Sequence, residues 1–500
     1  MLSEKWSRLK SGTDIRGVAS EGVPGETVNL TTDVCTAITN AFILWLCDKT
    51  EKNANELTVS VGRDSRISGP AISQAVTKAL SDGGVNVLNC GLASTPSMFM
   101  TTIDAGCDGA VQITASHHPF NRNGLKFFTR DGGLESEDIT SLLTLAQEGR
   151  IPEASSSGKV QDIDYMTEYS ARLRDIIKKG VNAADYDHPL KGFKIVVDAG
   201  NGAGGFYADK VLAPLGADTK GSRYLEPDGM FPNHVPNPEN SEAMKSICEA
   251  VLESKADLGV IFDTDVDRGG AVDSSGNEIN RNRLVAVASA IALEGNDGGT
   301  IVTDSITSEG LKEFIEQTLG GKHHRFKRGY KNVINEAIKL NSEGINCPLA
   351  IETSGHAAMR ENYFLDDGAY LCTKIIIKMA KLKQEGKTLE EYVSALKEAK
   401  EEKEVRYKIT ENDFRAYGES VIEKLNEYAL TKQGWTLADD SREGVRVSLD
   451  NEHGNGWFLL RLSVHDPIMP LNIESNDAGG VDVILKQVNE FISTCSGLTL

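Results

Sequence analysis

The chain lacks the features that mark a membrane protein, a secreted protein or a zinc-thiolate protein. No apolar run approaches the roughly 18 residues of a membrane helix; the longest runs are 41–46 and 284–293. The first residues hold no apolar signal core, so we expect no export and a cytoplasmic protein. None of the 8 cysteines forms a Cys-x-x-Cys pair. This argues against a zinc site or a disulfide framework and suits a reducing compartment.

Positive charge is outnumbered, since 53 Lys and Arg residues face 73 Asp and Glu residues, for a formal net charge of −20. Such a surface repels nucleic acid and anionic membranes, and we expect neither as a partner. It would equally repel a phosphorylated substrate, so any phosphate must bind at a local basic island. The candidate islands are Arg63 with Arg66, Lys327 with Arg328 and Lys331, and Arg446 with Arg461. The oligomeric state cannot be read from the sequence.

What is present is an alternation of strand and helix patterns, in a chain of 500 residues that is long enough for three or four domains. A strand at 57–61, a helix at 70–81 and a strand at 85–88 form a βαβ unit, which predicts a parallel sheet. The same pattern returns at 193–198, 258–263 and 299–304. Beyond an exposed helix and linker expected over 378–404, strands at 446–449 and 457–462 predict a smaller α+β domain.

The most informative stretch is Ile113-Thr114-Ala115-Ser116-His117-His118-Pro119. The apolar run 109–113 predicts a buried strand, and Pro119 cannot continue a central strand. Ser116 therefore lies where a strand ends and a loop begins, the place where α/β folds carry reacting groups.

A second motif, Asp263-Thr264-Asp265-Val266-Asp267-Arg268, follows the apolar strand 258–262. Residues i, i+2 and i+4 of an extended chain project to one side, so the three carboxylates converge. Their repulsion is relieved by a hard divalent cation, and such oxygen ligands suit Mg²⁺. Arg268 adds a positive charge beside this anionic site.

Other classes of site were weighed against these motifs. An EF-hand would need glycine and glutamate where the chain has Arg268 and Ser274, so it is excluded. The glycines of 200–205 lack the spacing and the later acidic residue of a dinucleotide site. An aspartyl-phosphate phosphatase, with Asp263 as nucleophile, stays open on the motif alone, although Asp267 departs from its usual pattern.

Two weaker motifs each place functional groups at alternate positions. Glu352 and Ser354 can present an acceptor and a hydroxyl together, which suits a pair of sugar hydroxyls. Arg461 and Ser463 come after a strand and before a turn, and they can cradle a phosphate.

Together, in this order, the motifs resemble the α-D-phosphohexomutase family, which includes phosphoglucomutase, phosphomannomutase and phosphoglucosamine mutase. The resemblance spans nearly the whole chain. The matching segments are Thr13-Asp14-Ile15-Arg16-Gly17, Gly62-Arg63-Asp64-Ser65-Arg66, Thr114-Ala115-Ser116-His117-His118-Pro119, Asp263-Thr264-Asp265-Val266-Asp267-Arg268, Gly329-Tyr330-Lys331, Glu352-Thr353-Ser354-Gly355 and Arg461-Leu462-Ser463.

The resemblance implies three similar mixed α/β domains and a smaller C-terminal α+β domain around a central cleft. We place these domains at 1–155, 156–280, 281–404 and 405–500. It also implies a mutase that interconverts hexose 1-phosphate and hexose 6-phosphate of glucose or mannose. The reaction would use a phosphoserine, Mg²⁺, and glucose 1,6-bisphosphate as primer and intermediate.

The resemblance further implies a role for each matching residue. Ser116 would carry phosphate, with His117, Lys126 and Arg16 as the other catalytic residues. The metal would be bound by Ser116, Asp263, Asp265 and Asp267. The residues that would bind the hexose phosphate are Arg268, Lys331, Glu352, Ser354, Arg461, Ser463 and His465.

Two departures from the family pattern concern the loops that would bind phosphate. His118 replaces the usual asparagine, and Val464-His465 replaces a Gly/Asn-Thr pair. The second change loses a hydroxyl donor, which His465 would replace only when protonated. Alternatives are therefore a glucose 1,6-bisphosphate synthase, a phosphoglucosamine mutase, and a sugar-phosphate sensor without catalysis.

Overall fold

The computed structural model describes residues 2–463 and 466–500. Its contacts divide the chain into two compact units. The first comprises Met1–Leu284 and Ser354–Glu391, and the second comprises Val285–Thr353 and Tyr392–Leu500. Every helix in the described residues is too short or too polar to span a bilayer.

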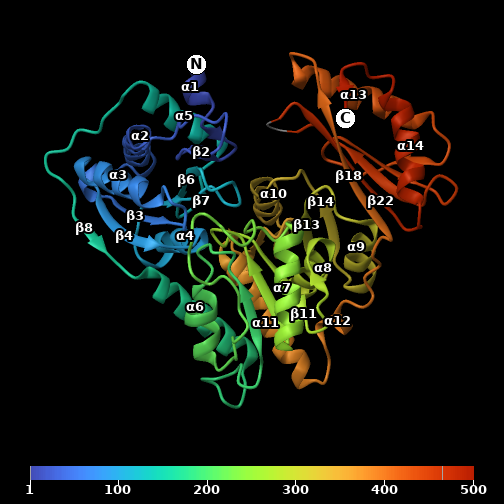
Figure 1. Cartoon of the computed structure of the whole chain (residues 1–500), viewed down its shortest axis with the longest axis horizontal. Coiled ribbons are helices and arrows are strands. Elements are labelled where there is room, and N and C mark those ends of the chain that lie inside the picture. Colours follow the sequence, from blue (N-terminus) through green and yellow to red (C-terminus); the bar gives the residue numbers. More distant parts are fainter. Residues whose placement is uncertain (1, 464–465) are drawn as a thin grey trace. The chain divides into compact units, whose positions relative to one another are not determined.

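The first unit opens with a mixed sheet of order β1-β2-β6-β5-β3-β4-β8, with β7 paired to β6 (Figure 1). Strand β3 is parallel to β4 and β5, whereas β6 is antiparallel to both β5 and β2. The predicted βαβ unit is thereby confirmed. The strands are β1 (Lys10–Ser11), β2 (Asp14–Val18), β3 (Thr58–Arg63), β4 (Asn86–Leu92), β5 (Gly109–Ile113), β6 (Arg122–Thr129), β7 (Gly132–Gly133) and β8 (Val160–Asp162).

Helices pack on the central part of this sheet, where β5 is buried along its whole length. Val111 and Ile113 of β5 join a buried cluster with α2 (Thr32–Thr50), α3 (Gly69–Asp82) and α5 (Ser136–Gln147). The intervening Gln112 is not part of that cluster, and its amide donates to Ala93 O at 2.9 Å. Helix α4 (Thr95–Asp104) also packs against β3, β5 and β6. Because successive side chains of β5 point to opposite faces of the sheet, Val111 and Ile113 face one helical layer and Gln112 faces the other side.

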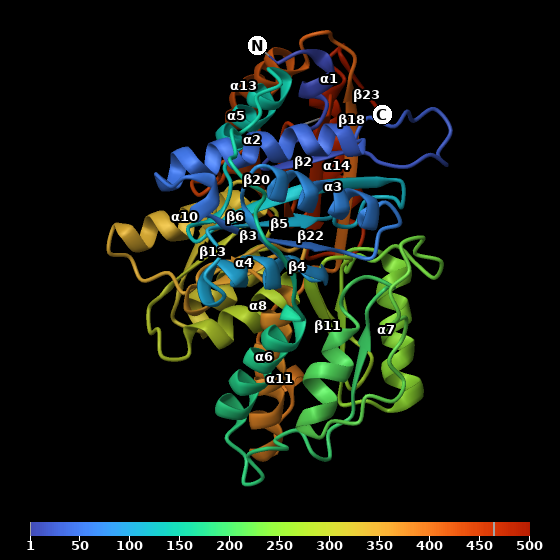
Figure 2. The ribbon, with the colours of Figure 1, turned by 90° about the vertical axis from the view of Figure 1, so that its left-hand side faces the viewer.

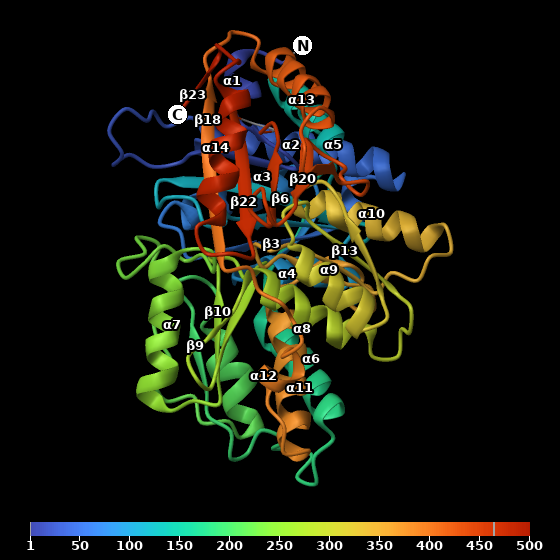
Figure 3. The same cartoon turned by 90° about the vertical axis from the view of Figure 1, so that its right-hand side faces the viewer.

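A second sheet of the same unit has the order β12-β11-β10-β9. Strands β9 (Ile195–Asp198) and β10 (Leu258–Phe262) are parallel, as the repeated strand pattern predicts. Helix α7 (Ser241–Ser254) packs on this sheet (Figure 3), and α11 (Gly368–Gln384) packs on it and alongside α6 (Tyr165–Val181) (Figure 2). The other strands of this unit are β11 (Gly269–Asp273), β12 (Glu278–Ile279), β16 (Ala357–Met359) and β17 (Leu365–Asp366).

The prediction of an exposed helix over 378–404 is wrong. The segment contains the end of α11, the short helix α12 (Leu389–Tyr392) and the start of strand β18 (Glu401–Ile409). Ile375, Ile376 and Met379 of α11 are buried. The lysines and glutamates lie between these apolar positions, so their number hid the buried face of α11.

The second unit contains three parallel strands, β14 (Lys322–Arg325), β13 (Thr300–Thr303) and β15 (Leu349–Ile351), with α10 (Tyr330–Ser342) packed on β13 and β15. Its C-terminal part is a sheet of order β19-β20-β21-β22-β18-β23, against which α13 (Phe414–Leu430) and α14 (Gly480–Ile492) pack (Figure 3). This is the predicted smaller α+β domain. Its further strands are β19 (Trp435–Leu437), β20 (Val445–Leu449), β21 (Gly456–Leu460), β22 (Ile468–Ser475) and β23 (Leu498–Thr499).

The remaining helical elements of the chain are α1 (Glu4–Ser7), η1 (Ala54–Glu56), η2 (Tyr207–Leu212), η3 (Ala213–Leu215), α8 (Arg281–Leu293), α9 (Glu309–Glu313), η4 (Phe314–Thr318) and η5 (Arg360–Asn362).

Arg446, a candidate phosphate island in the sequence, is buried instead. Its guanidinium lies over the Trp457 ring at 3.6 Å and donates to the carbonyls of Ser305 at 2.9 Å and Thr307 at 3.0 Å. The same group forms an ion pair with Glu309 at 3.0 Å. Arg446 therefore ties β20 to the segment after β13 and is not available to a ligand.

The loop before α7 is held to β9 by a buried histidine. His234 Nε2 lies 3.0 Å from Asp198 Oδ1, and its Nδ1 lies 3.0 Å from Val235 O. Ser246 donates to the other oxygen of Asp198 at 2.6 Å. Burial by itself lowers the pKa of His234, but the hydrogen bond and charge of Asp198 outweigh it and raise this pKa above its ordinary value.

We predict that His234→Gln destabilises the first unit more at about pH 6 than at about pH 8.5. Because the pKa of His234 is raised in the folded state, protonated His234 stabilises the fold fully below its unfolded pKa of about 6.5. This stabilisation is lost as pH rises through the folded-state pKa of His234. Urea midpoints of both proteins across this range, with an NMR titration of His234, would measure the effect. The control is His188→Gln, which removes a surface pair with Asp185. A stability difference that stays constant with pH would contradict the prediction.

Candidate active site

Ser116 lies just beyond β5, in a conformation that serine rarely adopts. Its φ is 49°, in the left-handed region. Such a backbone costs about 1–3 kcal/mol and persists only where neighbours enforce it. The Ser116 amide donates to Thr114 Oγ1 at 2.9 Å, and the residue is only 3% exposed. The strand end predicted from the sequence is therefore a strained turn that directs one hydroxyl.

Three aspartates converge beyond the end of β10, as the alternating motif predicts. One oxygen each of Asp263, Asp265 and Asp267 lies within 4.8 Å of the others, and all three residues are buried. The Oδ1 atoms of Asp265 and Asp267 accept no hydrogen bond from any described residue. Buried oxygen acceptors without donors are costly, and a hard cation is the partner they fit. The donor set therefore suits Mg²⁺.

Ser116 contacts this carboxylate cluster directly. Its Oγ lies 2.9 Å from Asp263 Oδ2 and donates to it. Burial, followed by the charges of Asp267 and Asp265, holds the pKa of Asp263 well above its usual range. Asp267 behaves oppositely: although burial raises its pKa, Lys126 and other nearby cations lower it overall. Asp263 thus has a greater need than Asp267 for a proton or another positive partner.

The two cationic residues expected at the serine lie on adjacent strands of the first sheet. Lys126 of β6 contacts Asp267 and lies 3.4 Å from Asp265 Oδ2. Arg16 of β2 is paired with Asp14 at 2.8 Å and lies opposite Gly124 in the β2–β6 register. The antiparallel pairing of β2, β6 and β5 therefore brings both to the edge of the sheet that carries Ser116.

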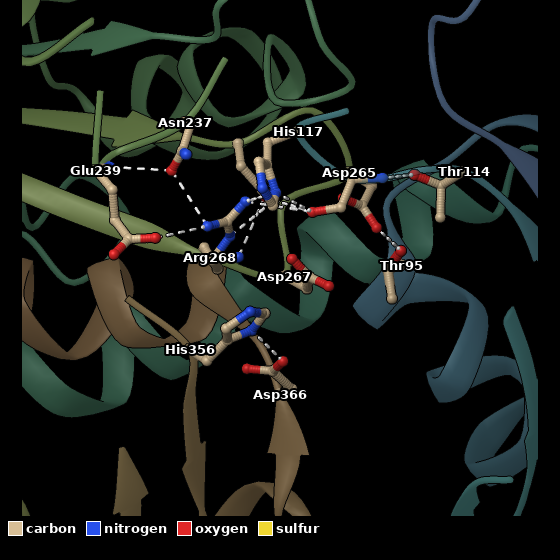
Figure 4. Close-up of polar contacts among 12 residues, drawn as sticks. Thr95, Thr114, His117, Asn237, Glu239, Asp265, Asp267, Arg268, His356 and Asp366 are labelled. Atoms are coloured by element: carbon tan, nitrogen blue, oxygen red, sulfur yellow. Dashed lines mark hydrogen bonds and ion pairs between the residues drawn. The ribbon is translucent and has the colours of Figure 1, made fainter. Parts of the chain in front are cut away.

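Arg268 fixes the protonation of His117 (Figure 4). Its Nη2 donates to His117 Nδ1 at 2.5 Å and to Ser116 Oγ at 3.3 Å. A guanidinium only donates, so Nδ1 must be an acceptor and the proton of neutral His117 lies on Nε2. Burial and the charge of Arg268 also lower the pKa of His117 to about 2. Asn237 and Glu239 hold the other nitrogen, Nη1, at 3.1 and 3.5 Å.

Two further contacts at the site were missed from the sequence. Thr95, the first residue of α4, donates to Asp265 through its hydroxyl, and its amide donates to Asp265 O at 2.8 Å. His356 Nδ1 lies 2.5 Å from Asp366 Oδ2 (Figure 4). One possible metal-ligand atom each of His356, Asp366 and Asp267 lies within 4.8 Å of the other two. Burial lowers the pKa of His356, but Asp366 and Asp267 outweigh it and raise it to about 9. Only the histidine directly after Ser354-Gly355 could have signalled this contact.

The expected sugar loop is split between the two units. Glu352 belongs to the second unit, where its Oε1 accepts the Gly329 amide at 2.6 Å. Lys331 lies in the first turn of the helix that follows Gly329, α10. Ser354 belongs to the first unit, is 5% exposed, and its Oγ has no hydrogen-bond partner in the described residues.

The expected phosphate loop follows β21 in the second unit. Burial lowers the pKa of Arg461, and the charge of Glu443 is the largest effect that opposes it. The Ser463 amide donates to Ile468 O at 3.0 Å, and the Ser463 hydroxyl accepts the Asp466 amide at 3.3 Å. His465 lies outside the described residues.

Comparison with known proteins assigns most of the chain to one family. Models described as phosphoglucomutase/phosphomannomutase, alpha/beta/alpha domains I, II and III match residues 8–148, 171–276 and 280–399. These matches contain Ser116, the three aspartates and Glu352. The phosphatase alternative gains no support from them.

Full-length relatives agree with these matches. A phosphomannomutase/phosphoglucomutase of Pseudomonas putida is 30% identical over 88% of this chain and 87% of its own. A phosphoglucomutase of Neisseria meningitidis is 28% identical over 96% of both. The crystal structure of a Burkholderia thailandensis phosphoglucomutase/phosphomannomutase family protein covers 99% of this chain and 98% of its own, with 25% identity and a TM-score of 0.80. The chain therefore belongs to the α-D-phosphohexomutase family of mutases.

Proposed function

We propose that this mutase interconverts the 1-phosphate and 6-phosphate of glucose or mannose through phosphorylated Ser116 and a hexose 1,6-bisphosphate. The observation that carries the proposal is the surroundings of the Ser116 hydroxyl. Its Oγ lies within hydrogen-bond distance of both Asp263 and Arg268, beside carboxylates arranged for a cation. The names of the relatives support glucose and mannose as the sugars.

In the first transfer, a hydroxyl oxygen of the hexose monophosphate attacks the phosphorus on Ser116. The phosphorus–Oγ bond breaks, a new phosphorus–oxygen bond forms, and the hydroxyl proton is passed to the released Oγ. The bisphosphate then turns end for end and returns its other phosphate to Ser116 by the reverse step. The sum is an isomerisation, and it consumes no other donor.

The cationic residues near Ser116 serve this transfer through charge. Phosphoryl transfer needs positioning and neutralisation more than covalent chemistry. Arg268 donates toward Oγ, while Lys126 and Arg16 supply positive charge and proton handling at the transferring oxygens. Neutral His117 orients the Arg268 fork by accepting from it. Mg²⁺ bound by Asp263, Asp265, Asp267 and the Ser116 phosphate would neutralise charge on the transferring group.

The remaining residues are proposed to hold the substrate. Glu352, Ser354 and Lys331 would bind sugar hydroxyls, in either orientation of the sugar. Arg461, Ser463 and His465 would anchor the phosphate that does not react, because arginine offers a planar fork to phosphate oxygens. Coupled assays with the 1-phosphates of glucose, mannose and glucosamine would identify the sugar. Adding and withholding the bisphosphate would separate a mutase from a bisphosphate synthase.

Intact mass should reveal wild-type protein that is about 80 Da heavier because one phosphate is attached. Ser116→Ala should abolish that species and reduce kcat by orders of magnitude, whereas Ser420→Ala on α13 should change neither. Full turnover in Ser116→Ala would refute the role of this serine.

Removal of divalent cations with EDTA should stop turnover, and Mg²⁺ should restore it. Asp265→Asn replaces a buried carboxylate by an amide and should raise the Mg²⁺ concentration needed for half-maximal activity. The control is Asp257→Asn, at a carboxylate that pairs with Lys383 and accepts the Lys194 amide. Normal turnover of the metal-free enzyme would show that the aspartates do not work through a cation.

Arg461→Ala should reduce kcat/KM by roughly 10- to 150-fold, since a charge-assisted contact is worth about 1.5–3 kcal/mol. Arg406→Ala, at a surface pair with Glu404, is the control. A normal kcat/KM in the Arg461 variant would place the distal phosphate elsewhere. If His465 contributes as a cation, affinity should weaken as pH rises through about 6.5, and His465→Ala should remove that component.

A further inference from the structure

The strained backbone at Ser116 needs a group that enforces it, and the buried arginine of the Gly62-Arg63-Asp64-Ser65-Arg66 segment meets that need. Arg66 has no exposed surface. It lies in the loop after β3, the strand that pairs with β5 in the first sheet. The two strands end side by side, so their loops face each other.

The guanidinium of Arg66 binds the serine loop entirely through backbone carbonyls. Nη1 donates to Pro119 O at 2.7 Å and to Arg122 O at 3.0 Å. Nη2 donates to His118 O at 2.6 Å and also to Ser116 O. Four carbonyls within a seven-residue span, residues 116–122, therefore converge on one planar fork.

The guanidinium of Arg66 is itself held in place by contacts with Asp64 and Phe231. Arg66 Nε lies 3.2 Å from Asp64 Oδ2, and Asp64 Oδ1 accepts the Arg66 amide at 2.9 Å. The Asp64 amide in turn donates to Ile113 O, the last residue of β5, at 3.0 Å. Phe231 lies against the guanidinium, with its ring centroid 5.2 Å away. The arginine is thus held by the same sheet that carries the serine.

These contacts exclude a ligand role for Arg66. Both terminal nitrogens already donate to loop carbonyls, and no surface is left for a phosphate. The basic island expected at Arg63 and Arg66 is therefore not a phosphate site on the Arg66 side. Arg66 also does not touch the reacting Oγ, so any effect on the reaction must pass through the loop.

We propose that Arg66 is a positioning residue for phosphoryl transfer: its fork clamps residues 116–122 so that Ser116 Oγ stays directed at Asp263 and Arg268. The inference rests on the proposed function, in which Ser116 carries the phosphate. Lysine has one nitrogen with three donors and cannot reproduce four in-plane hydrogen bonds. Charge alone is therefore insufficient at this position.

The test compares Arg66→Lys with Arg174→Lys, at an arginine of α6 that also donates to a backbone carbonyl, that of Lys210, and has no proposed role in the site. We expect Arg66→Lys to lower kcat about 100-fold, the scale of a 1 Å misplacement, with KM changed less than about threefold. Arg174→Lys should stay close to wild type. The rate at which the dephosphorylated enzyme takes phosphate from glucose 1,6-bisphosphate, followed by intact mass, should fall in parallel with kcat.

A rescue experiment separates the fork from general folding. Millimolar guanidinium or methylguanidinium should restore part of the kcat of Arg66→Ala, and methylammonium should not. If Arg66→Ala does not fold, Arg66→Lys decides the matter through the split between kcat and KM. Wild-type kcat in Arg66→Lys, or equal rescue by methylammonium, would overturn the proposal. A wild-type enzyme that never carries phosphate on Ser116 would instead overturn the proposed function.

Discussion

The arrangement around Ser116 depends on the neutralisation of three carboxylates that are buried together. Asp263, Asp265 and Asp267 could not remain ionised in this position without positive partners. Lys126 reaches them from β6 and Arg268 from the loop that carries the aspartates, and the two supply part of that charge. The unpartnered oxygens of Asp265 and Asp267 leave the rest of the demand to a cation. A phosphorylated substrate would need such local positive charge, because the whole chain carries a net charge of −20.

Two arginines hold the serine from opposite directions, and one loop supports both. Arg66 binds the backbone of Ser116, whereas Arg268 reaches its hydroxyl. The loop between η3 and α7 places Phe231 against Arg66 and Asn237 against Arg268. His234, in the middle of that loop, fastens it to β9 through Asp198. The site is therefore built from two sheets of one compact unit, with the loop as their shared support.

The sequence was most informative where local pattern and chemistry coincide. The run 109–113 predicted a strand that ends at Ser116, and the spacing of Asp263, Asp265 and Asp267 predicted their convergence. Arg66 could not be assigned, because its burial and its partners in the loop after β5, 50 or more residues away in the sequence, decide whether it binds phosphate or carbonyls. The same reason explains Arg446, whose stacking on Trp457 depends on register rather than composition. His356 was missed because a single histidine carries no periodic signal.

The membership of Glu352 and Arg461 in one compact unit has a consequence for selectivity. Under the proposed roles, this unit would hold Glu352 and Arg461 at a fixed separation. It would thereby set the distance between the bound sugar hydroxyls and the phosphate that does not react. Arg446 stabilises this separation because it joins β20 to the segment after β13. Under the proposed mechanism a sugar phosphate would have to present the same span in both of its orientations, so only a substrate of matching length could complete both transfers.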